Sequence, residues 1–212
     1  MKKFSLKAFG GGLSALVAMS GVGAALYLGS DNNTGSIAAA PNIHNLSDAG
    51  KALDKNLSES QKQRDEEVRE VSLSYELPAG ATFETDYSFE ELNDQRTQLE
   101  AQSAGASSDV AEFEVQEVWY EPGYFKSDAL VQWQCAWLKE AILAQESHDA
   151  ARLDNAASQL REFKNKPEAA MFPDYDVFLA DNLVPVEKGD TKAARSFLNS
   201  GYSCVEQNQI KD

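Results

Sequence analysis

The stretch D-A-L-V-Q-W-Q-C-A-W-L-K-E-A-I-L-A-Q, Asp128–Gln145, has the strongest periodicity in this chain of 212 residues and decides its fold. Plotted at about 100° per residue, its apolar side chains fill an arc of roughly 200° that includes Trp133 and Trp137. Gln132 and Lys139 lie on the narrower polar strip. A helix that is apolar over most of its circumference is covered on most sides. We therefore predict a central helix here, with both tryptophans in the core.

Helical patterns continue on the carboxy-terminal side of this stretch. Residues 149–164 form an amphipathic segment after a short link, which predicts an antiparallel helical hairpin. A short helix is expected at 175–183, and Asp190 can cap a last helix over 191–200. These patterns predict a compact helical domain over residues 108–212.

Two pieces on the amino-terminal side alternate apolar and polar residues. They are V-S-L-S-Y-E-L at Val71–Leu77 and A-E-F-E-V-Q at Ala111–Gln116. Alternation with period two is typical of strands, so we predict that these pieces pair. Two strands alone are marginally stable and must lie on helices. The predicted fold class is mainly α with at most a short two-stranded β element.

The remaining segments between the amino terminus and the helical domain have weaker patterns. Residues 47–69 have apolar residues at helical spacing around a polar middle, and Ser88 with Glu91 fits a capping box for a helix ending near Gln102. We predict a loosely packed segment over 47–107. Residues 31–46 are small and polar with one proline, which indicates a tether.

The amino terminus is basic and then apolar. Three lysines, the last of them Lys7, precede an uncharged run of 23 residues, Ala8–Ser30. As a helix this run reaches about 34 Å, enough for a hydrocarbon core of about 30 Å. Lysines on the amino-terminal side place that end in the cytoplasm. Residues 1–30 are therefore predicted to be a cytoplasmic stub and transmembrane anchor, with the rest of this single-pass cell-membrane protein outside.

A cleaved secretory signal is the alternative to a retained anchor. Ser36 and Ala38 are small residues at the spacing of a cleavage site, but they lie well beyond the apolar run. Cleavage after Ala40 would place Pro41 next to the scissile bond. Six of the 13 glycines fall in the apolar run, which membrane helices tolerate and soluble helices do not. Length and composition favour the retained anchor.

Charge and cysteine content restrict the partners. The chain has 19 basic and 34 acidic residues and a net charge of -15, which argues against a broad nucleic-acid-binding surface. Its two cysteines, Cys135 and Cys204, are predicted to form a disulfide outside the cell, the alternative being two buried free thiols. The two histidines, His44 and His148, fit no metal-ligand spacing.

Two stretches carry a resemblance. They are W-Q-C-A-W-L-K-E-A-I-L-A-Q-E at Trp133–Glu146 and G-D-T-K-A-A-R-S-F-L-N-S-G-Y-S-C at Gly189–Cys204. Together with the anchor layout, these last 80 or so residues resemble the uncharacterised single-anchor exported proteins of actinobacteria. The resemblance implies a cell-surface helical domain, and it supplies no activity and no functional residue.

Candidate functional residues are few. Trp119, Tyr120 and Tyr124 are the best candidates for an exposed aromatic interaction surface, the alternative being that the strand packs them onto the helices. Asp174 and Asp176 form a D-Y-D triplet with oxygen ligands but without a calcium loop. The sequence predicts no catalytic residue, no cofactor and no metal.

Two functions remain open. The first is a membrane-anchored extracytoplasmic helical binding or assembly module, with the lipid bilayer and another exported protein or a cell-wall component as partners. The second is an extracytoplasmic hydrolase that uses carboxylates, with Asp174 and Asp176 as its candidates. No nucleophile motif or phosphate loop is present, which favours the binding module.

Overall fold

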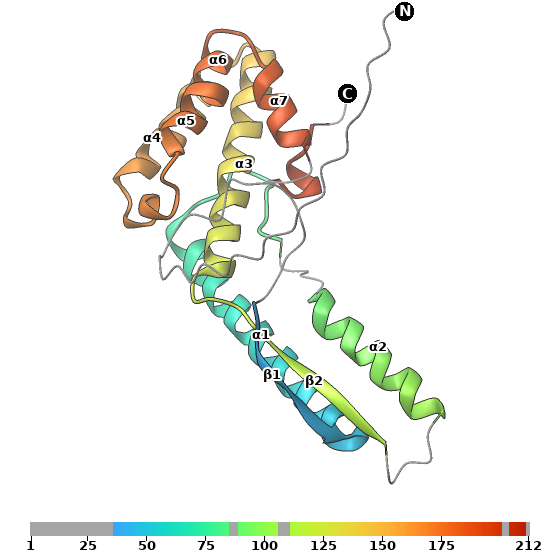
Figure 1. Cartoon of the computed structure of the whole chain (residues 1–212). Coiled ribbons are helices and arrows are strands. Elements are labelled where there is room, and N and C mark those ends of the chain that lie inside the picture. Colours follow the sequence, from blue (N-terminus) through green and yellow to red (C-terminus); the bar gives the residue numbers. More distant parts are fainter. Residues whose placement is uncertain (1–35, 85–88, 106–110, 201–203, 211–212) are drawn as a thin grey trace, which may run out of the picture.

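The computed structural model of the chain describes residues 36–84, 89–105, 111–200 and 204–210. It is mainly helical with one two-stranded sheet, and it has two parts, an elongated arm and a helical head (Figure 1). The elements of the arm are β1 (Ser36–Asn45), α1 (Leu46–Ser74), α2 (Glu90–Gly105) and β2 (Glu112–Trp119). The elements of the head are α3 (Tyr124–Glu146), α4 (Ala150–Glu162), α5 (Tyr175–Phe178), α6 (Val184–Glu187) and α7 (Lys192–Asn199), with short 3-10 turns and a π-helical turn, Leu179–Leu183, between α5 and α6.

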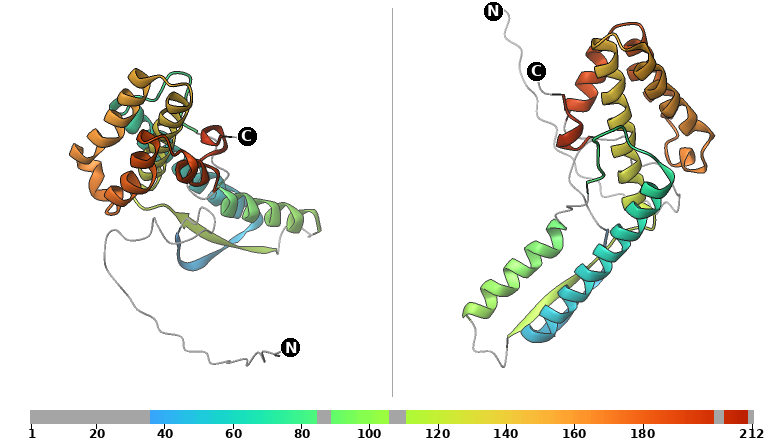
Figure 2. Two further views of the ribbon diagram at one scale, coloured as in Figure 1. Left: turned by 90° about the horizontal axis from the view of Figure 1, so that it is seen from above. Right: turned by 180° about the vertical axis from the view of Figure 1, so that it is seen from behind.

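In the arm, the sheet lies along α1 with α2 beside it (Figure 2). β1 and β2 are antiparallel, with Asn45 opposite Glu112 at one end and Ser36 opposite Trp119 at the other. Phe113, Val115 and Val118 of β2 are buried in the core that the sheet shares with α1 and α2. The arm therefore has a hydrophobic core continuous with that of the head.

The edge of β2 is covered by side-chain amides of the two arm helices. The side chain of Gln95 in α2 donates to the carbonyl of Gln116 at 2.9 Å and accepts from its N–H at 2.8 Å. In the same way Asn56 in α1 makes both bonds to the backbone of Val118, at 2.8 and 2.9 Å. An uncovered strand edge is a template for pairing with another chain. These amides occupy the donors and acceptors that a further strand would need.

The central helix is confirmed as α3. Trp133 and Trp137 are both buried, and α4 packs antiparallel against α3 as the predicted hairpin. Gln132, expected on the polar strip, is instead buried, because its side chain accepts from the N–H of Glu84 at 2.7 Å. A buried polar group that is hydrogen-bonded in this way is tolerated in a core.

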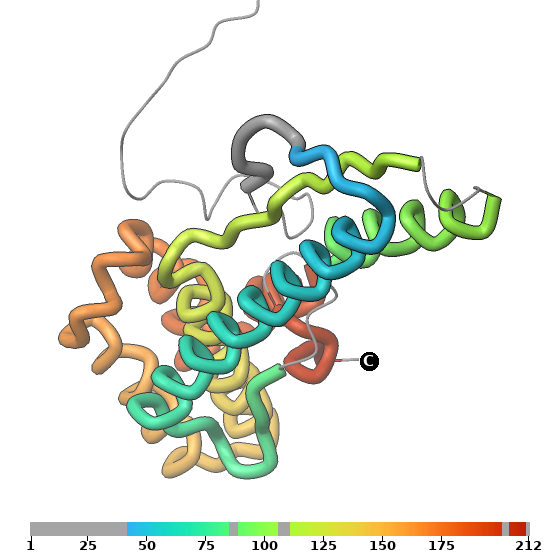
Figure 3. The backbone as a smooth tube through the Cα atoms, turned by 90° about the horizontal axis from the view of Figure 1, so that it is seen from below, coloured from blue at the N-terminus to red at the C-terminus, as the bar shows by residue number. Residues whose placement is uncertain are grey.

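The segment that follows α1 is held across α3. The indole N–H groups of Trp133 and Trp137 both donate to the carbonyl oxygen of Glu76, at 2.8 and 2.9 Å. One carbonyl oxygen has two lone pairs and accepts both bonds. Figure 3 shows α1 extending from the sheet to the side of α3, so this helix packs in both parts of the molecule.

The predicted disulfide is confirmed. The sulfur atoms of Cys135 and Cys204 are 2.00 Å apart, and the two residues are separated by 69 positions. The bond fixes the carboxy-terminal tail on α3, where the carbonyl of Gln207 accepts from the ammonium of Lys139 at 2.6 Å. The side chain of Gln207 in turn donates to the carbonyl of Thr82 at 2.7 Å. The disulfide thus holds the tail, and the tail holds the segment between α1 and α2.

Two predictions about the arm are wrong. Val71–Leu77 is not a strand, because α1 continues to Ser74. Val71 and Tyr75, four residues apart, are both buried, whereas Leu73 between them is 76% exposed. Burial at i and i+4 is helical spacing, and the apparent alternation satisfied both patterns. The partner of β2 is β1, which occupies most of the segment that was predicted to be a tether. β2 itself lies in the arm and not with the helices of residues 108–212.

No helix in residues 36–84, 89–105, 111–200 or 204–210 is long and apolar enough to cross a bilayer. The predicted anchor, residues 1–30, lies outside the described residues. Helix α2 begins at Glu90, and Ser88, the predicted cap of its capping box, is also outside them.

Candidate functional site

An open groove of about 470 Å³ lies beside α7. Its surface is about half polar and half apolar, and its lining residues come from the turn before α7 and from the exposed face of that helix: Gly189, Asp190, Thr191, Lys192, Arg195, Ser196 and Asn199. Gly189 has a φ of 91°, a left-handed conformation that glycine adopts without strain. Asp190, predicted as a cap, accepts a hydrogen bond from the N–H of Lys192 at 3.1 Å.

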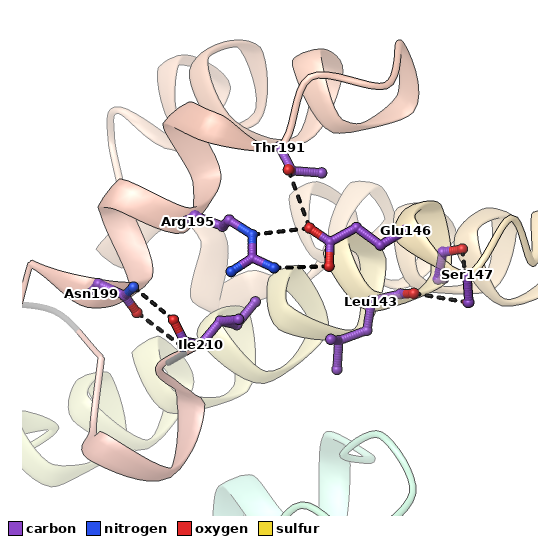
Figure 4. Close-up of polar contacts among 8 residues, drawn as sticks. Leu143, Glu146, Ser147, Thr191, Arg195, Asn199 and Ile210 are labelled. Carbon is purple, nitrogen blue, oxygen red and sulfur yellow. Dashed lines mark hydrogen bonds and ion pairs between the residues drawn. The ribbon is translucent and has the colours of Figure 1, made fainter. Parts of the chain in front are cut away.

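Arg195, which lines the groove, forms an ion pair that joins α7 to the end of α3. Arg195 donates to both carboxylate oxygens of Glu146 at 2.9 Å, and the hydroxyl of Thr191 donates to the same carboxylate at 3.3 Å. Asn199 makes two bonds to the backbone of Ile210, at 2.8 and 2.9 Å (Figure 4). A bidentate pair of this kind sets the orientation of both side chains. These contacts therefore orient the Arg195 and Asn199 side chains that line the groove.

Two polar groups of the groove are left for a ligand. Within the part of the chain that the structure describes, neither the ammonium of Lys192 nor the hydroxyl of Ser196 has a hydrogen bond or ion pair. Both side chains are exposed. The groove can therefore offer a cation and a hydroxyl to a partner, without breaking an internal contact.

The three aromatic residues predicted as an interaction surface do not form one exposed patch. Trp119 is 47% exposed, whereas Tyr120 is 2% exposed and Tyr124 is half-buried. Successive side chains of a strand point to opposite faces, so Trp119 points outward and Tyr120 points inward. The rings of Tyr120 and Tyr124 lie 5.3 Å apart, in the packed region where the arm meets the head. Only Trp119 remains as an exposed aromatic surface among the three.

Tyr120 packs in an aromatic cluster of the core with Phe89, Tyr124 and Phe125. Among the described residues, its hydroxyl and the Oε2 atom of Glu91 are buried without a hydrogen-bond partner. Burial and, as a smaller contribution, the charge of Glu91 raise the pKa of Tyr120 to about 12. Burial, followed by the charge of Asp128, raises the pKa of Tyr124 to about 12. Both phenols are neutral at physiological pH and are not poised as acids or bases.

The raised pKa values predict a loss of stability in alkali. Unfolded tyrosine has a pKa near 10, so the unfolded chain ionises first, and the contribution of Tyr120 is present below pH ~10 and lost as the pH rises to about 12. Melting temperature measured across this range should fall less steeply in Tyr120→Phe. The hydroxyl removed has no described partner, so the variant loses no hydrogen bond. Equal slopes in the two proteins would contradict this assignment.

The carboxylates proposed for metal binding or hydrolysis are not assembled into a site. Asp174 and Asp176 are both exposed, and Asp176 pairs with the ammonium of Lys164 at 2.5 Å. No three His, Cys, Asp or Glu side chains in the described ranges are grouped to hold a metal ion. A carboxylate enzyme needs one acid kept protonated by burial, and an exposed pair does not provide it.

Changing both carboxylates, as Asp174→Asn with Asp176→Asn, is therefore expected to leave stability within about 1 kcal/mol and to leave any phenotype in cells intact. Thermal unfolding and a complementation assay at matched protein levels measure the two effects. Loss of function at a normal level and melting temperature would make the hydrolase the leading hypothesis.

His148 lies in the turn between α3 and α4 and is exposed. Its φ of 56° is left-handed, and the N–H of Asp149 after it donates to the carbonyl of Ala144 at 2.9 Å, which closes the end of α3. This is the position where helices most often carry glycine. His148 thus contributes to the turn that ends α3, and no Ser, Thr or Cys side chain among the described residues is hydrogen-bonded to its imidazole.

Replacing His148 with glycine is expected to raise the free energy of unfolding by about 1 kcal/mol, because a side chain in this conformation is strained by about 1 to 2 kcal/mol. His148→Ala is the control, since alanine keeps the strain and should give no gain. Urea unfolding of the two variants provides the comparison. A gain of the same size in both would mean that the imidazole itself is unfavourable.

Sequence patterns could not have identified the groove. Arg195 and Glu146 are 49 positions apart, and neither belongs to a recognisable motif. The only local signal was Asp190 followed by a helix, which marks a helix start and not a binding surface.

No protein-family model matches the chain, and no curated protein or solved structure shows significant similarity to it. The resemblance to exported actinobacterial proteins therefore stays a prediction.

Proposed function

We propose that the chain is a membrane-anchored extracytoplasmic helical module that binds another exported protein or a cell-wall component through the groove beside α7. The observation that carries the proposal is the arrangement of the groove. The guanidinium of Arg195, which lines the groove, is paired with Glu146 of α3, while Lys192 and Ser196 remain available. An exposed surface whose lining residues include no buried acid or nucleophile is suited to recognition and not to catalysis.

The disulfide supports export. Disulfides persist in oxidising compartments and are rare in the cytosol. Cys135 is fully buried and Cys204 nearly so, and the bond holds the tail on α3. Such a bond is a structural element of the folded head, which fits a protein that folds outside the cytoplasm.

The sheet supports a retained anchor. The small residues that could mark a cleavage site, Ser36 and Ala38, lie within β1. Cutting there or after Ala40 would remove Ser36–Ala38, whose backbone pairs with residues 117–119 of β2. A signal is removed during export, so the mature chain would then lack part of its sheet.

The groove is tested by filling it. Ser196→Trp places a bulky side chain on the exposed face of α7, and Ser158→Trp makes the same change on the exposed face of α4 as a matched control. Amine-reactive cross-linking in intact cells should give an adduct of defined mass in the wild type and in Ser158→Trp, and none in Ser196→Trp. The proposal fails if the adduct survives in Ser196→Trp, or if no adduct forms in any of the three at normal protein levels.

A further inference from the structure

Trp119 is an exposed aromatic residue at a defined end of the sheet. It is 47% exposed, while its neighbours Val118 and Tyr120 are buried, so its indole lies on the solvent side. Its strand partner is Ser36, the first residue of β1. The position of this indole is therefore tied to the point where the chain enters the sheet from the amino terminus.

The chain between the apolar run and the sheet is short. Only residues 31–35 separate Ser30 from Ser36, so the two ends are at most ~20 Å apart. Paired residues of antiparallel strands lie about 5 Å apart at their Cα atoms, so Trp119 is within ~25 Å of the end of the apolar run. Headgroups extend the bilayer by about 5 to 8 Å beyond its hydrocarbon core. A retained anchor thus keeps this indole within reach of the headgroup layer.

We infer that the surface around Trp119 rests on the lipid headgroups, with the indole as an interfacial contact. The inference depends on the anchor of the proposed function. Tryptophan is enriched at membrane interfaces, where its apolar ring and its N–H are both satisfied. Tethering raises the local concentration of lipid around the indole, so even a weak preference keeps the contact formed.

The charges beside the indole select the lipid. Glu117 and Glu121 are exposed on either side of Trp119 in the chain, and Asp31 lies in the connection to the anchor. These carboxylates are repelled by anionic headgroups and attracted by the cationic groups of zwitterionic ones. The surface therefore fits a zwitterionic lipid such as phosphatidylcholine.

The experiment uses the full chain in phosphatidylcholine vesicles whose acyl chains are brominated near the headgroup, because bromine quenches tryptophan on contact. Trp133 and Trp137 are buried in the head and out of reach of the lipid. Quenching is expected in the wild type and should disappear in Trp119→Phe. Exchanging part of the lipid for an anionic one at low salt should reduce the quenching, and added salt should restore it.

Ile43 offers a matched control on the same sheet. It is 68% exposed and lies seven residues farther along β1, about 23 Å from the anchored end. In the Trp119→Phe background, Ile43→Trp should show little quenching. Equal quenching at the two positions would overturn a contact localised at Trp119.

Flotation of the vesicles separates the two proposals. A chain that does not float with the lipid, or that is extracted by alkaline carbonate, has no retained anchor, and the proposed membrane attachment fails. A chain that floats without quenching of Trp119 keeps its anchor and overturns only the inferred contact.

Discussion

Replacing Trp137 with alanine is expected to lower the free energy of unfolding by about 3 to 5 kcal/mol and to abolish function by unfolding the head. The indole is buried on the central helix and donates to the carbonyl of Glu76, so the change leaves a cavity and removes a hydrogen bond. The carbonyl itself keeps the bond from Trp133. Urea unfolding of the full chain in detergent micelles measures the loss.

Trp119→Ala is the control for this prediction, since it deletes the same side chain at a half-exposed position. Its cost should be about 1 kcal/mol or less. Losses of equal size would mean that Trp137 is not part of a close-packed core.

Removing the disulfide, as Cys135→Ala with Cys204→Ala, is expected to destabilise the chain by about 4 kcal/mol. The bond closes a loop with a sequence separation of 69 residues, and its loss increases the conformational freedom of the unfolded chain. It also releases the tail whose Gln207 holds the segment between α1 and α2. Thermal unfolding with and without a reducing agent measures the effect.

The reducing agent provides the control. Wild type under reducing conditions should melt near the temperature of the double variant, and the variant should not respond to the reagent. Mass measured before and after reduction should differ by two hydrogens in the wild type alone. Alkylation of both thiols in the native, unreduced protein would contradict the bridge.

The helical head could be predicted from the sequence because its signals are strong and local. The apolar arc that includes Trp133 and Trp137 is typical of a buried helix. The short link to the next helix predicts that the two pack as a hairpin. The disulfide followed from a count of two cysteines in a chain predicted to be exported. These features depend on residues within a few turns of one another or on composition alone.

The arm and the groove could not be predicted because they depend on distant partners. β1 has no alternating pattern, and its pairing with β2 joins residues more than 65 positions apart. The end of α1 satisfied strand and helix patterns equally, and packing of Val71 and Tyr75 decided between them. The side-chain amides of Asn56 and Gln95 bond to the backbone of β2. The sequence patterns of the two helices that carry them give no sign of this contact.

The position of the two cysteines has a consequence for secretion. In the export that we propose, the chain crosses the membrane from its amino terminus, so Cys135 would reach the oxidising side well before Cys204, which lies 69 positions later. With two cysteines, no wrong bridge can form within one molecule, and the isomerisation of disulfides is never needed. The one incorrect product is then an intermolecular disulfide, formed between the Cys135 thiols of two nascent chains before Cys204 has emerged. On the proposed export route the faulty product is thus a covalent dimer, and its amount should rise with the rate of synthesis.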